Sequence, residues 1–407
     1  MTEPSSSTAA HLHLSRSAGE SLPPGSDPGV GSRSEPGESG GGGAGPPNVL
    51  AVDGLTVKLA AHPDRSSILD DVTFTVAPGE VLGIVGESGS GKSVLALSIL
   101  GLLPPALVMQ ARRIALLGED LAGQPREMWR THRGRNVAMI FQEPMTSLNP
   151  VMRVGTQIEE VLRWRGRMRG QPARRRALEL LEQVEIPSPK SRLQAYPHEL
   201  SGGMRQRVMI AIALAAEPKL LIADEPTTAL DVTVQAQILD LLRGLQRQSG
   251  LSLILITHDL GVIADMTDRV LVLYAGRTAE LAPVRTIFDA PAHPYTEALL
   301  TAIPDLGPRR HRLATIAGSV PGAMEMPPGC RFAPRCRYRQ AACEAAPPPL
   351  HPLSAAHLVA CIHPIAYVTR KAVDAPTPPP LAGGSSREAD RWGEGATEPN
   401  ENSAEPQ

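Results

Sequence analysis

Aromatic residues are scarce in this chain, making up 3% of its 407 residues. Its core must therefore be aliphatic, and apolar residues do reach 42% of the sequence. A chain of this length has room for two or three domains. No apolar run approaches the roughly 18 to 20 residues that span a bilayer, and no basic cluster followed by an apolar stretch marks a signal peptide at the N-terminus. We expect any membrane association to come through partners.

An excess of charge of one sign is also missing. Charged residues account for 20% of the chain, and the formal net charge is −2. Proteins that bind nucleic acid usually carry a strongly basic patch or domain. We therefore expect no nucleic-acid partner.

The two ends of the chain contain few apolar residues. Residues 1–47 consist mainly of Ser, Gly, Pro and Glu, and residues 369–407 have a similar composition. Segments of this kind bury too little apolar surface to fold. We expect a disordered N-terminal arm and a disordered C-terminal tail.

The sequence between these ends has an α/β pattern. Short apolar runs of strand length alternate with segments of helical periodicity, which predicts a buried, largely parallel sheet with helices beside it. The motifs described below do not repeat, so we expect one nucleotide-binding unit. The expected strands are 50–58, 72–76, 81–85, 137–141, 220–223, 253–257 and 270–274, and the expected helices are 92–103, 174–184, 203–216 and 234–248.

A glycine-rich loop follows the third expected strand. The segment Gly86-Glu-Ser-Gly-Ser-Gly-Lys-Ser93 fits the pattern G-x-x-x-x-G-K-[ST] between a strand and a helix. Its glycines allow the backbone amides to point inward at phosphate oxygens, and the helix N-terminus adds to the attraction. Lys92 is expected on the β- and γ-phosphates of ATP and Ser93 on Mg²⁺. A turn that binds nothing is the alternative. The predicted phosphate-binding residues are Gly86, Glu87, Ser88, Gly89, Ser90, Gly91, Lys92 and Ser93.

Two acids end another apolar run, Leu220-Leu-Ile-Ala-Asp224-Glu225. Asp224 suits a contact to Mg²⁺, and Glu225 can face the γ-phosphate and polarise a water. Phosphoryl transfer depends mainly on positioning and charge neutralisation, so these groups nearly complete a site for ATP hydrolysis. The alternative is that Asp224 caps a turn.

Further motifs resemble those of ABC ATPases. The segment Leu200-Ser-Gly-Gly-Met-Arg-Gln-Arg207 is similar to the signature motif of that family. The resemblance covers about residues 48–365 and implies an ABC-type P-loop NTPase domain at 48–283, with a RecA-like core and a helical subdomain at about 143–215. Gln142 resembles the Q-loop glutamine, Asp231 the D-loop aspartate and His258 the switch histidine.

The resemblance also implies roles for these residues. Ser201, Gly202 and Gly203 start a helical segment, where free amides and a hydroxyl form a second anion site. The family implies a head-to-tail dimer in which each ATP lies between the P-loop of one subunit and the signature motif of the other. The expected catalytic residues are Glu225, His258, Lys92 and Gln142, with Gln142 also near Mg²⁺ and Asp231 at the dimer contact. For His258 and Asp231, a structural histidine and an ordinary turn acid are the alternatives.

One position departs from the family pattern. ABC ATPases usually carry an aromatic residue that stacks on adenine near the end of an early strand. Leu59 occupies the corresponding place here. We therefore expect nucleotide affinity to depend mainly on phosphate contacts.

Residues 284–368 resemble the C-terminal extension of dipeptide, oligopeptide and nickel importer ATPases. The segment His293-Pro-Tyr295 and a C-x5-C-x6-C-x17-C array carry this resemblance. Four thiolates can hold a [4Fe–4S] cluster or Zn²⁺. Because the short spacings typical of zinc sites are missing, we favour iron–sulfur in a structural role, and free thiols are a further alternative. The expected ligands are Cys330, Cys336, Cys343 and Cys361.

Together these features predict the ATP-hydrolysing subunit of an importer for dipeptides or oligopeptides. Expected partners are a second ATP-binding subunit, two integral-membrane permease subunits and an extracytoplasmic substrate-binding protein, with this chain on the cytoplasmic face of the inner membrane. Residues 142–149 are the expected permease contact. An importer of nickel or another small solute is the alternative within the family. A soluble ABC ATPase and a non-hydrolysing regulatory subunit are alternatives outside it.

Overall fold

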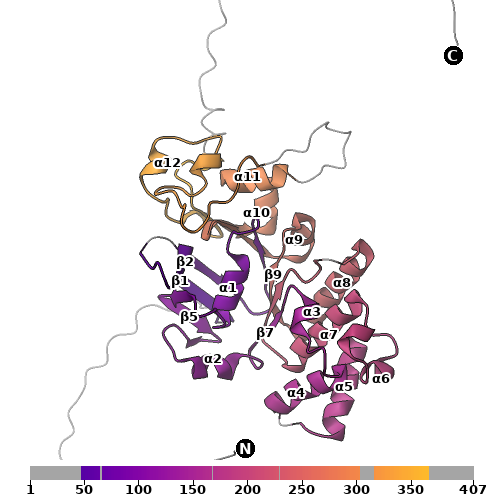
Figure 1. Ribbon diagram of the computed structural model, residues 1–407. Coiled ribbons are helices and arrows are strands. Elements are labelled where there is room, and N and C mark those ends of the chain that lie inside the picture. The colour runs from indigo at the N-terminus through magenta and orange to yellow at the C-terminus, as the bar shows by residue number, and fades with distance from the viewer. Residues whose placement is uncertain (1–46, 65–66, 167, 229, 303–315, 366–407) are drawn as a thin grey trace, which may run out of the picture. The chain divides into compact units, whose positions relative to one another are not determined.

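The computed structural model describes residues 47–64, 67–166, 168–228, 230–302 and 316–365 (Figure 1). The predictions of disorder at residues 1–47 and 369–407 fall outside this range, except for residue 47. Among the described residues, no helix combines the length and apolar character needed to cross a membrane.

An eight-stranded sheet forms the centre of the fold, in the order β12-β13-β11-β10-β3-β9-β8-β7. Five neighbouring strands are parallel, and three more continue the sheet in antiparallel fashion. The parallel strands are β3 (Val81–Val85), β7 (Val137–Ile140), β8 (Leu220–Asp224), β9 (Ser252–Ile256) and β10 (Arg269–Tyr274). The antiparallel strands are β11 (Arg277–Pro283), β12 (His351–Ser354) and β13 (His357–Val359).

Burial explains why the parallel strands were predictable. Every residue of β3, β8 and β9 is buried, so each strand is a nearly continuous apolar run. The antiparallel part was not predicted. Strand β11 follows β10 after only two residues and carries the charged Glu280 at its centre, which interrupts the apolar pattern.

A second, five-stranded sheet corrects the expectation of a single largely parallel sheet. It is antiparallel, with the order β2-β1-β5-β6 and β4 paired to β1. Much of β1 and β2 alternates between buried and partly exposed positions, as expected where one face of a sheet packs on a core. The strands are β1 (Leu50–Leu59), β2 (Ser67–Val76), β4 (Leu107–Gln110), β5 (Arg113–Leu116) and β6 (Glu119–Asp120).

Helix α1 (Lys92–Ile99) joins the two sheets through one apolar core. Its residues Leu95 and Ile99 share a cluster with side chains from β1 and β2 and with side chains from β3, β8 and β9. The helix ends earlier than the predicted residue 103. Gly101, two residues beyond its last residue, has a left-handed φ of 62°, which α-helical geometry does not allow.

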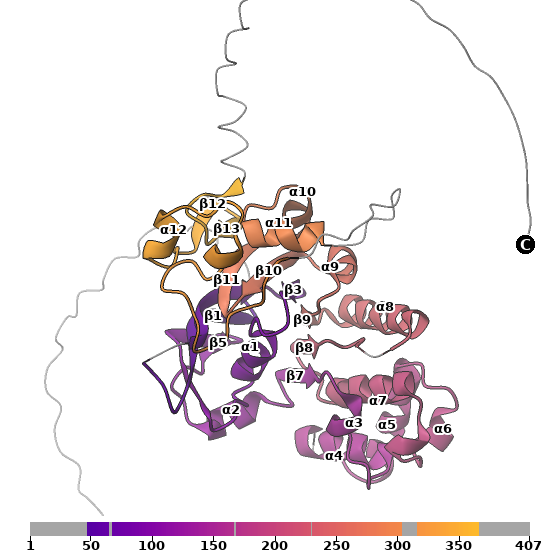
Figure 2. The same ribbon diagram turned by 45° about the horizontal axis from the view of Figure 1, so that its top comes forward.

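A group of helices lies between β7 and β8 in the sequence. Helices α4, α5 and α7 contact one another, and they share a core with α8 (Val232–Ser249). Figures 1 and 2 both show this group apart from α1, with strands of the central sheet between them. The helices are α3 (Pro144–Ser147), α4 (Val154–Gly166), α5 (Gln171–Gln183), α6 (Pro189–Arg192) and α7 (Gly202–Ala215). Outside the group are α2 (Arg126–His132) and α9 (Leu260–Met266).

The C-terminal region packs against β10 and β11 and contains α10 (Val284–Asp289), α11 (Pro294–Thr301) and α12 (Ala342–Ala345). Three of the chain's few aromatic residues meet here. The ring centroid of Tyr274 lies 4.5 Å from that of Tyr295 and 5.1 Å from that of Phe332. The rings of Tyr295 and Phe332 are 5.3 Å apart, so the three form one buried cluster behind the end of β10.

A buried carboxylate organises the start of α11. Glu280 is fully buried in β11 and accepts hydrogen bonds from the amides of Ala292 (2.8 Å) and His293 (2.9 Å). Its carboxylate also lies 2.7 Å from Nε2 of His357. Burial acts to raise the pKa of Glu280, but hydrogen bonds from His357 and the two amides act against it, and the pKa lies below its usual value.

His293 predicts a pH dependence of stability. Its Nδ1 accepts the amide of Tyr295 at 3.0 Å and caps α11, and burial lowers its pKa from 6.5 to about 4. Between these two pH values the unfolded chain binds the extra proton, so stability is lost as pH falls through this window, by up to about 3 kcal/mol. His293→Asn keeps a capping side chain and should flatten this part of the pH profile in urea unfolding. The exposed His62→Asn is the control, and parallel profiles for His293→Asn and the wild type would contradict the assignment.

Candidate active site

Parallel pairing brings the ends of three strands together. Strand β9 lies between β3 and β8, with Ile256 opposite both Ile84 and Asp224. The glycine-rich loop follows β3, Asp224 and Glu225 lie at the end of β8, and His258 follows β9. The predicted site residues from these three segments therefore lie at one edge of the sheet.

The glycine-rich loop closes tightly between β3 and α1. A Cβ atom on Gly86 would lie 2.2 Å from the carbonyl oxygen of Leu273, so no other residue fits there. The ammonium group of Lys92 donates to the carbonyl oxygens of Gly86 (2.7 Å) and Glu87 (3.1 Å). Burial lowers the pKa of Lys92, and the charges of Glu225, Asp224 and Glu87 oppose that shift. Lys92 is thus a buried cation close to three acids.

A cavity of about 360 Å³ opens beside this loop. Most of the residues predicted for phosphate binding and catalysis line it, together with two residues that sequence reasoning missed, Ile68 and Val94. The lining residues are Ile68, Ser88, Gly89, Gly91, Lys92, Ser93, Val94, Gln142 and Glu225. Gly86, Glu87 and Ser90 belong to the same loop but do not line the cavity.

Asp224 lies beside the loop and is 4% exposed. Burial raises its pKa, Glu225 adds to the rise, and a hydrogen bond from Ser93 and the charge of Lys92 oppose it. Its Oδ1 atom is buried and has no hydrogen-bond partner among the described residues. A hydroxyl and an unpartnered carboxylate oxygen fit a Mg²⁺ site, because Mg²⁺ prefers oxygen ligands and uses few from the protein.

Glu225 faces the cavity from an unusual backbone conformation. Its φ is 48°, in the left-handed region that non-glycine residues seldom adopt. Its Oε2 accepts hydrogen bonds from Gln142 (3.1 Å) and from the hydroxyl of Thr228 (2.8 Å). Nδ1 of His258, whose side chain is 68% exposed, lies 3.5 Å from Oε1. The structure therefore brings Gln142 and His258 to the same carboxylate, a geometry suited to holding a water-polarising base.

The signature residues lie elsewhere. Ser201 caps α7, with its hydroxyl accepting the amide of Met204 at 3.3 Å, and Asp231 caps α8 by accepting the amide of Val234 at 3.0 Å. A Cβ on Gly203 would lie 2.6 Å from Val234, so α7 and α8 touch closely here. Ser201, Gly202, Gly203 and Asp231 do not line the cavity. One chain therefore carries two separate candidate anion sites.

The residues that line the cavity do not include Leu59, the residue at the place where ABC ATPases usually carry an adenine-stacking aromatic. Leu59 ends β1 and does not line the cavity, whereas Ile68, in β2, does. No aromatic residue is present among the described residues that line it. No local sequence pattern indicates Ile68, because only pairing of β2 within the second sheet brings it to the loop.

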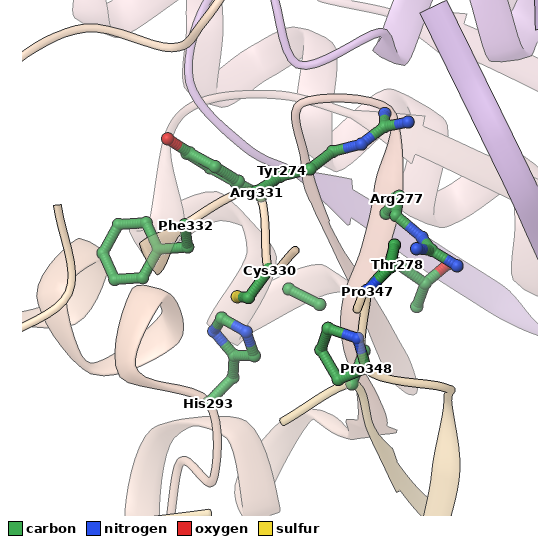
Figure 3. A pocket seen from close by; sticks show the side chains of 11 residues that line it. Tyr274, Arg277, Thr278, His293, Cys330, Arg331, Phe332, Pro347 and Pro348 are labelled. Atoms are coloured by element: carbon green, nitrogen blue, oxygen red, sulfur yellow. The ribbon is translucent and has the colours of Figure 1, made fainter. Parts of the chain in front are cut away.

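The four cysteines converge in the C-terminal region. All four line one cavity of about 20 Å³, together with His293 and His363. Burial raises the pKa values of Cys330 and Cys336, and it raises that of Cys361 to about 12. Figure 3 draws an adjoining pocket, which shares Cys330 and His293 with this cavity; there the side chain of Cys330 points toward His293, whereas Arg331 runs away from both. Nε2 of His363 is buried without a partner in the described chain.

The expected metal ligands do not form a finished metal site. Among the described residues, no three His, Cys, Asp or Glu side chains are arranged so that they could hold a metal ion. The cavity between the cysteines has room for little more than one water. The four cysteines thus line one cavity, but a [4Fe–4S] cluster or Zn²⁺ at this place gains no support from ligand geometry.

Two family models match this chain, one over the part that contains the nucleotide cavity and one over the C-terminal region. Residues 69–228 match the family model for ABC transporters, and residues 279–343 match that for the oligopeptide/dipeptide transporter C-terminal region. The first match contains the glycine-rich loop and both acids of β8. The second contains the segment from β11 to the third cysteine.

Similar proteins align over nearly their whole length. A Brucella abortus (strain 2308) protein named for peptide import and ATP binding is 51% identical over 77% of this chain and 94% of its own. The chain belongs to the ABC transporter family. The dipeptide transport ATP-binding protein DppD of Escherichia coli (strain K12) is 48% identical over 78% of this ABC protein and 97% of its own chain.

Solved structures of ABC cassettes share the fold. A dimeric, post-hydrolysis structure of the ATP-binding cassette MJ0796 with ADP and Pi matches 58% of this chain and 99% of its own, with a TM-score of 0.52 and 28% identity. Another dimeric structure of the same cassette gives a TM-score of 0.51 at 29% identity. The expected ABC-type P-loop fold, the peptide-importer family and an ATPase that serves transport are confirmed.

The geometry around Glu225 predicts the effect of one substitution. Glu225→Gln keeps the shape of the side chain and its contacts to Gln142 and Thr228, but it removes the base. We expect ATP binding to persist, hydrolysis to fall by at least roughly a hundredfold, and an ATP-bound dimer to accumulate in size-exclusion chromatography. The exposed Glu182→Gln on α5 should behave like the wild type. A monomer in the presence of ATP would count against the dimer, and unchanged turnover would rule out the proposed role of Glu225.

Proposed function

We propose that this ABC subunit hydrolyses ATP to drive the import of dipeptides or oligopeptides through a membrane permease. The observation that carries the proposal is the match of residues 279–343 to the C-terminal region of oligopeptide and dipeptide transporters. Similarity to a dipeptide transport protein over 97% of that protein's length supports the same cargo. Nickel or another small solute remains the second candidate within the family.

The proposed chemistry assigns a role to each group at the edge of the sheet. The loop amides and Lys92 hold the β- and γ-phosphates, while Ser93, Asp224 and Gln142 hold Mg²⁺, which neutralises phosphate charge when bound. Glu225 accepts a proton from the attacking water, and Gln142, Thr228 and His258 fix the position of its carboxylate. The buried position of Asp224 and Lys92 strengthens these electrostatic contacts, because water screens them less.

A head-to-tail dimer explains the two separate anion sites. The cavity at Lys92 has no contribution from Ser201, Gly202, Gly203 or Asp231 of the same chain. A second subunit, identical or distinct, would supply these residues to the opposite side of the bound ATP. The dimeric cassette with ADP and Pi, which resembles this chain, supports such an assembly. ATP then links the two subunits, and hydrolysis releases them.

The proposed permease contact lies after Gln142. Met145, in the segment 142–149, is 60% exposed, and Val151, just beyond it, is 80% exposed. Exposed apolar side chains that lie close together often mark a surface that binds another protein. We assign this surface to the two integral-membrane permease subunits, which places the chain on the cytoplasmic face of the inner membrane. An extracytoplasmic binding protein would deliver the cargo. In this division residues 48–283 form the motor, 143–215 its helical subdomain and 284–368 the extension.

Reconstitution tests the cargo. The full chain, co-purified with its permease from detergent-solubilised membranes and placed in liposomes with its binding protein, should import a labelled dipeptide only when ATP is on the side of this chain. The same complex carrying Glu225→Gln should import none. Uptake of Ni²⁺ without uptake of dipeptide or oligopeptide would contradict the peptide proposal and favour the second candidate.

We further propose a [4Fe–4S] cluster at the four cysteines, as a structural staple of the extension. The donor set supports it, because four thiols and an unpartnered histidine nitrogen surround one cavity. A single zinc ion needs its thiolates about 2.3 Å away and therefore close to each other. Among the described residues no three His, Cys, Asp or Glu side chains are arranged to hold a metal ion of either kind, so the choice of a cluster over zinc rests on the sequence spacing of the cysteines.

Anaerobic purification tests this proposal. The protein should be brown, with broad visible absorbance that bleaches on reduction and with iron and sulfide in equal amounts. Cys343→Ser, which removes one buried ligand, should lose most of this colour. A colourless protein with one zinc per chain would refute the cluster in favour of zinc, and a colourless, metal-free protein would leave four free thiols.

A further inference from the structure

The second residue of the phosphate loop, Glu87, is held by two side chains of the C-terminal region. Its amide donates to the hydroxyl of Tyr295 at 2.8 Å, across 208 residues of sequence. Its carboxylate accepts hydrogen bonds from both terminal nitrogens of Arg335, at 2.9 and 3.1 Å. Arg335 lies 248 residues further along the sequence. A two-pronged pair between arginine and carboxylate fixes direction as well as distance.

Both partners of Glu87 are themselves rigidly placed. Tyr295 is fully buried in the aromatic cluster with Tyr274 and Phe332. The side chain of Arg335 is 6% exposed, and it also donates to the carbonyl oxygens of Ala317 (2.8 Å) and Ile316 (3.3 Å). Because these anchors are buried, they resist the thermal motion that a loop between a strand and a helix would otherwise show.

Glu87 connects Tyr295 and Arg335 to Lys92. Its carbonyl oxygen accepts a hydrogen bond from the ammonium group of Lys92 at 3.1 Å. The same residue therefore contacts Tyr295 through its amide, Arg335 through its carboxylate and Lys92 through its carbonyl oxygen. A shift of Glu87 would move the groups that face the phosphates.

We propose that Tyr295 and Arg335 are positioning residues of the nucleotide site, which act through Glu87 to hold the phosphate loop in its binding conformation. They do not line the cavity, so we expect no direct contact between these two side chains and the nucleotide. A preformed loop loses less conformational entropy when ATP binds, and the gain appears as affinity. The inference depends on ATP binding by the loop and is independent of the cargo.

A purely structural role is the competing explanation, in which Arg335 only attaches the extension to the core. The two roles differ in a double-mutant cycle. If Arg335 acts through Glu87, removing both groups costs no more ATP affinity than removing one. If Arg335 acts only on the fold of the extension, its effect on affinity is absent or adds to that of Glu87→Gln.

The experiment measures the Kd of Mg²⁺-ATP for the full-length chain by displacement of a fluorescent ATP analogue. The variants are Tyr295→Phe, Glu87→Gln, Arg335→Gln and the double variant Glu87→Gln/Arg335→Gln, with Arg335→Lys as the conservative change. Tyr295→Phe removes one hydroxyl and keeps the ring in its cluster. Each single variant should weaken binding roughly threefold to tenfold, the range for one net hydrogen bond or partly buried charge pair.

The double variant should bind within about twofold of the weaker single variant, because the two groups form one interaction. Arg335→Lys should recover part of the loss. The control is Arg337→Gln. Arg337 lies two residues after Arg335 and forms an ion pair with Glu297, and the loss of this pair should leave Kd unchanged. Thermal unfolding of every variant identifies those that no longer fold, and Tyr295→Phe still decides the case if Arg335→Gln is among them.

Unchanged Kd in both Tyr295→Phe and Glu87→Gln would overturn the inference, as would additive losses in the double variant. These outcomes are distinct from failure of the proposed function. If the wild-type chain bound no ATP, the function itself would be wrong. If it bound ATP and imported no peptide, only the cargo would be wrong.

Discussion

Parallel pairing of β3, β9 and β8 concentrates charge at one edge of the sheet. Lys92 follows the first of these strands, and Asp224 and Glu225 end the last, so a cation and two anions meet where water is partly excluded. Burial drives Lys92 and Asp224 toward their neutral forms. Nearby acids oppose this shift at Lys92, and a hydrogen bond from Ser93 together with the charge of Lys92 opposes it at Asp224. Bound phosphate and Mg²⁺ would complete this pairing of charges, which is why we propose their sites at this edge of the sheet.

The same arrangement leaves the site incomplete within one chain. Residues of the signature segment cap α7 and touch α8, and that contact holds them away from the cavity at Lys92. Helices α3 to α7 follow Gln142 in the sequence, and the side-chain amide of Gln142 donates a hydrogen bond to Glu225. The glutamine therefore joins the catalytic carboxylate to the helices that carry the exposed Met145. Motion of this helical group relative to the sheet would change the hydrogen bond at the carboxylate, which would couple hydrolysis to the proposed permease contact.

How far the sequence predicts this structure depends on the range of each interaction. The loop from Gly86 to Ser93 and the acids at 224 and 225 were predictable, since local sequence sets both the chemistry and the strand–loop–helix context. The antiparallel sheet was predictable only in part: strands at 50–58 and 72–76 were expected, but no local pattern indicates that they pair in a second sheet. Ile68 reaches the cavity only through this long-range pairing. The contacts of Tyr295 and Arg335 with Glu87 were equally hidden, since no local pattern reports a partner more than 200 residues away.

Two arginines tie the cysteine-bearing segment to the nucleotide site. Arg335 directly precedes Cys336 and holds Glu87, while Arg331 directly follows Cys330 and donates to the hydroxyl of Ser67 (2.9 Å) and to Asp70 (2.7 Å). Ser67 and Asp70 flank Ile68 at the cavity wall.

Each arginine can hold its partner only as firmly as its own backbone is fixed, and both backbones belong to a segment with little regular structure. Whatever orders that segment, whether packing of Phe332 or a group bound by the cysteines, therefore also orders the phosphate loop and the strand beside it. This coupling explains in physical terms why the C-terminal extension is joined to the ATPase domain: the extension stabilises the conformation in which the phosphate loop binds ATP.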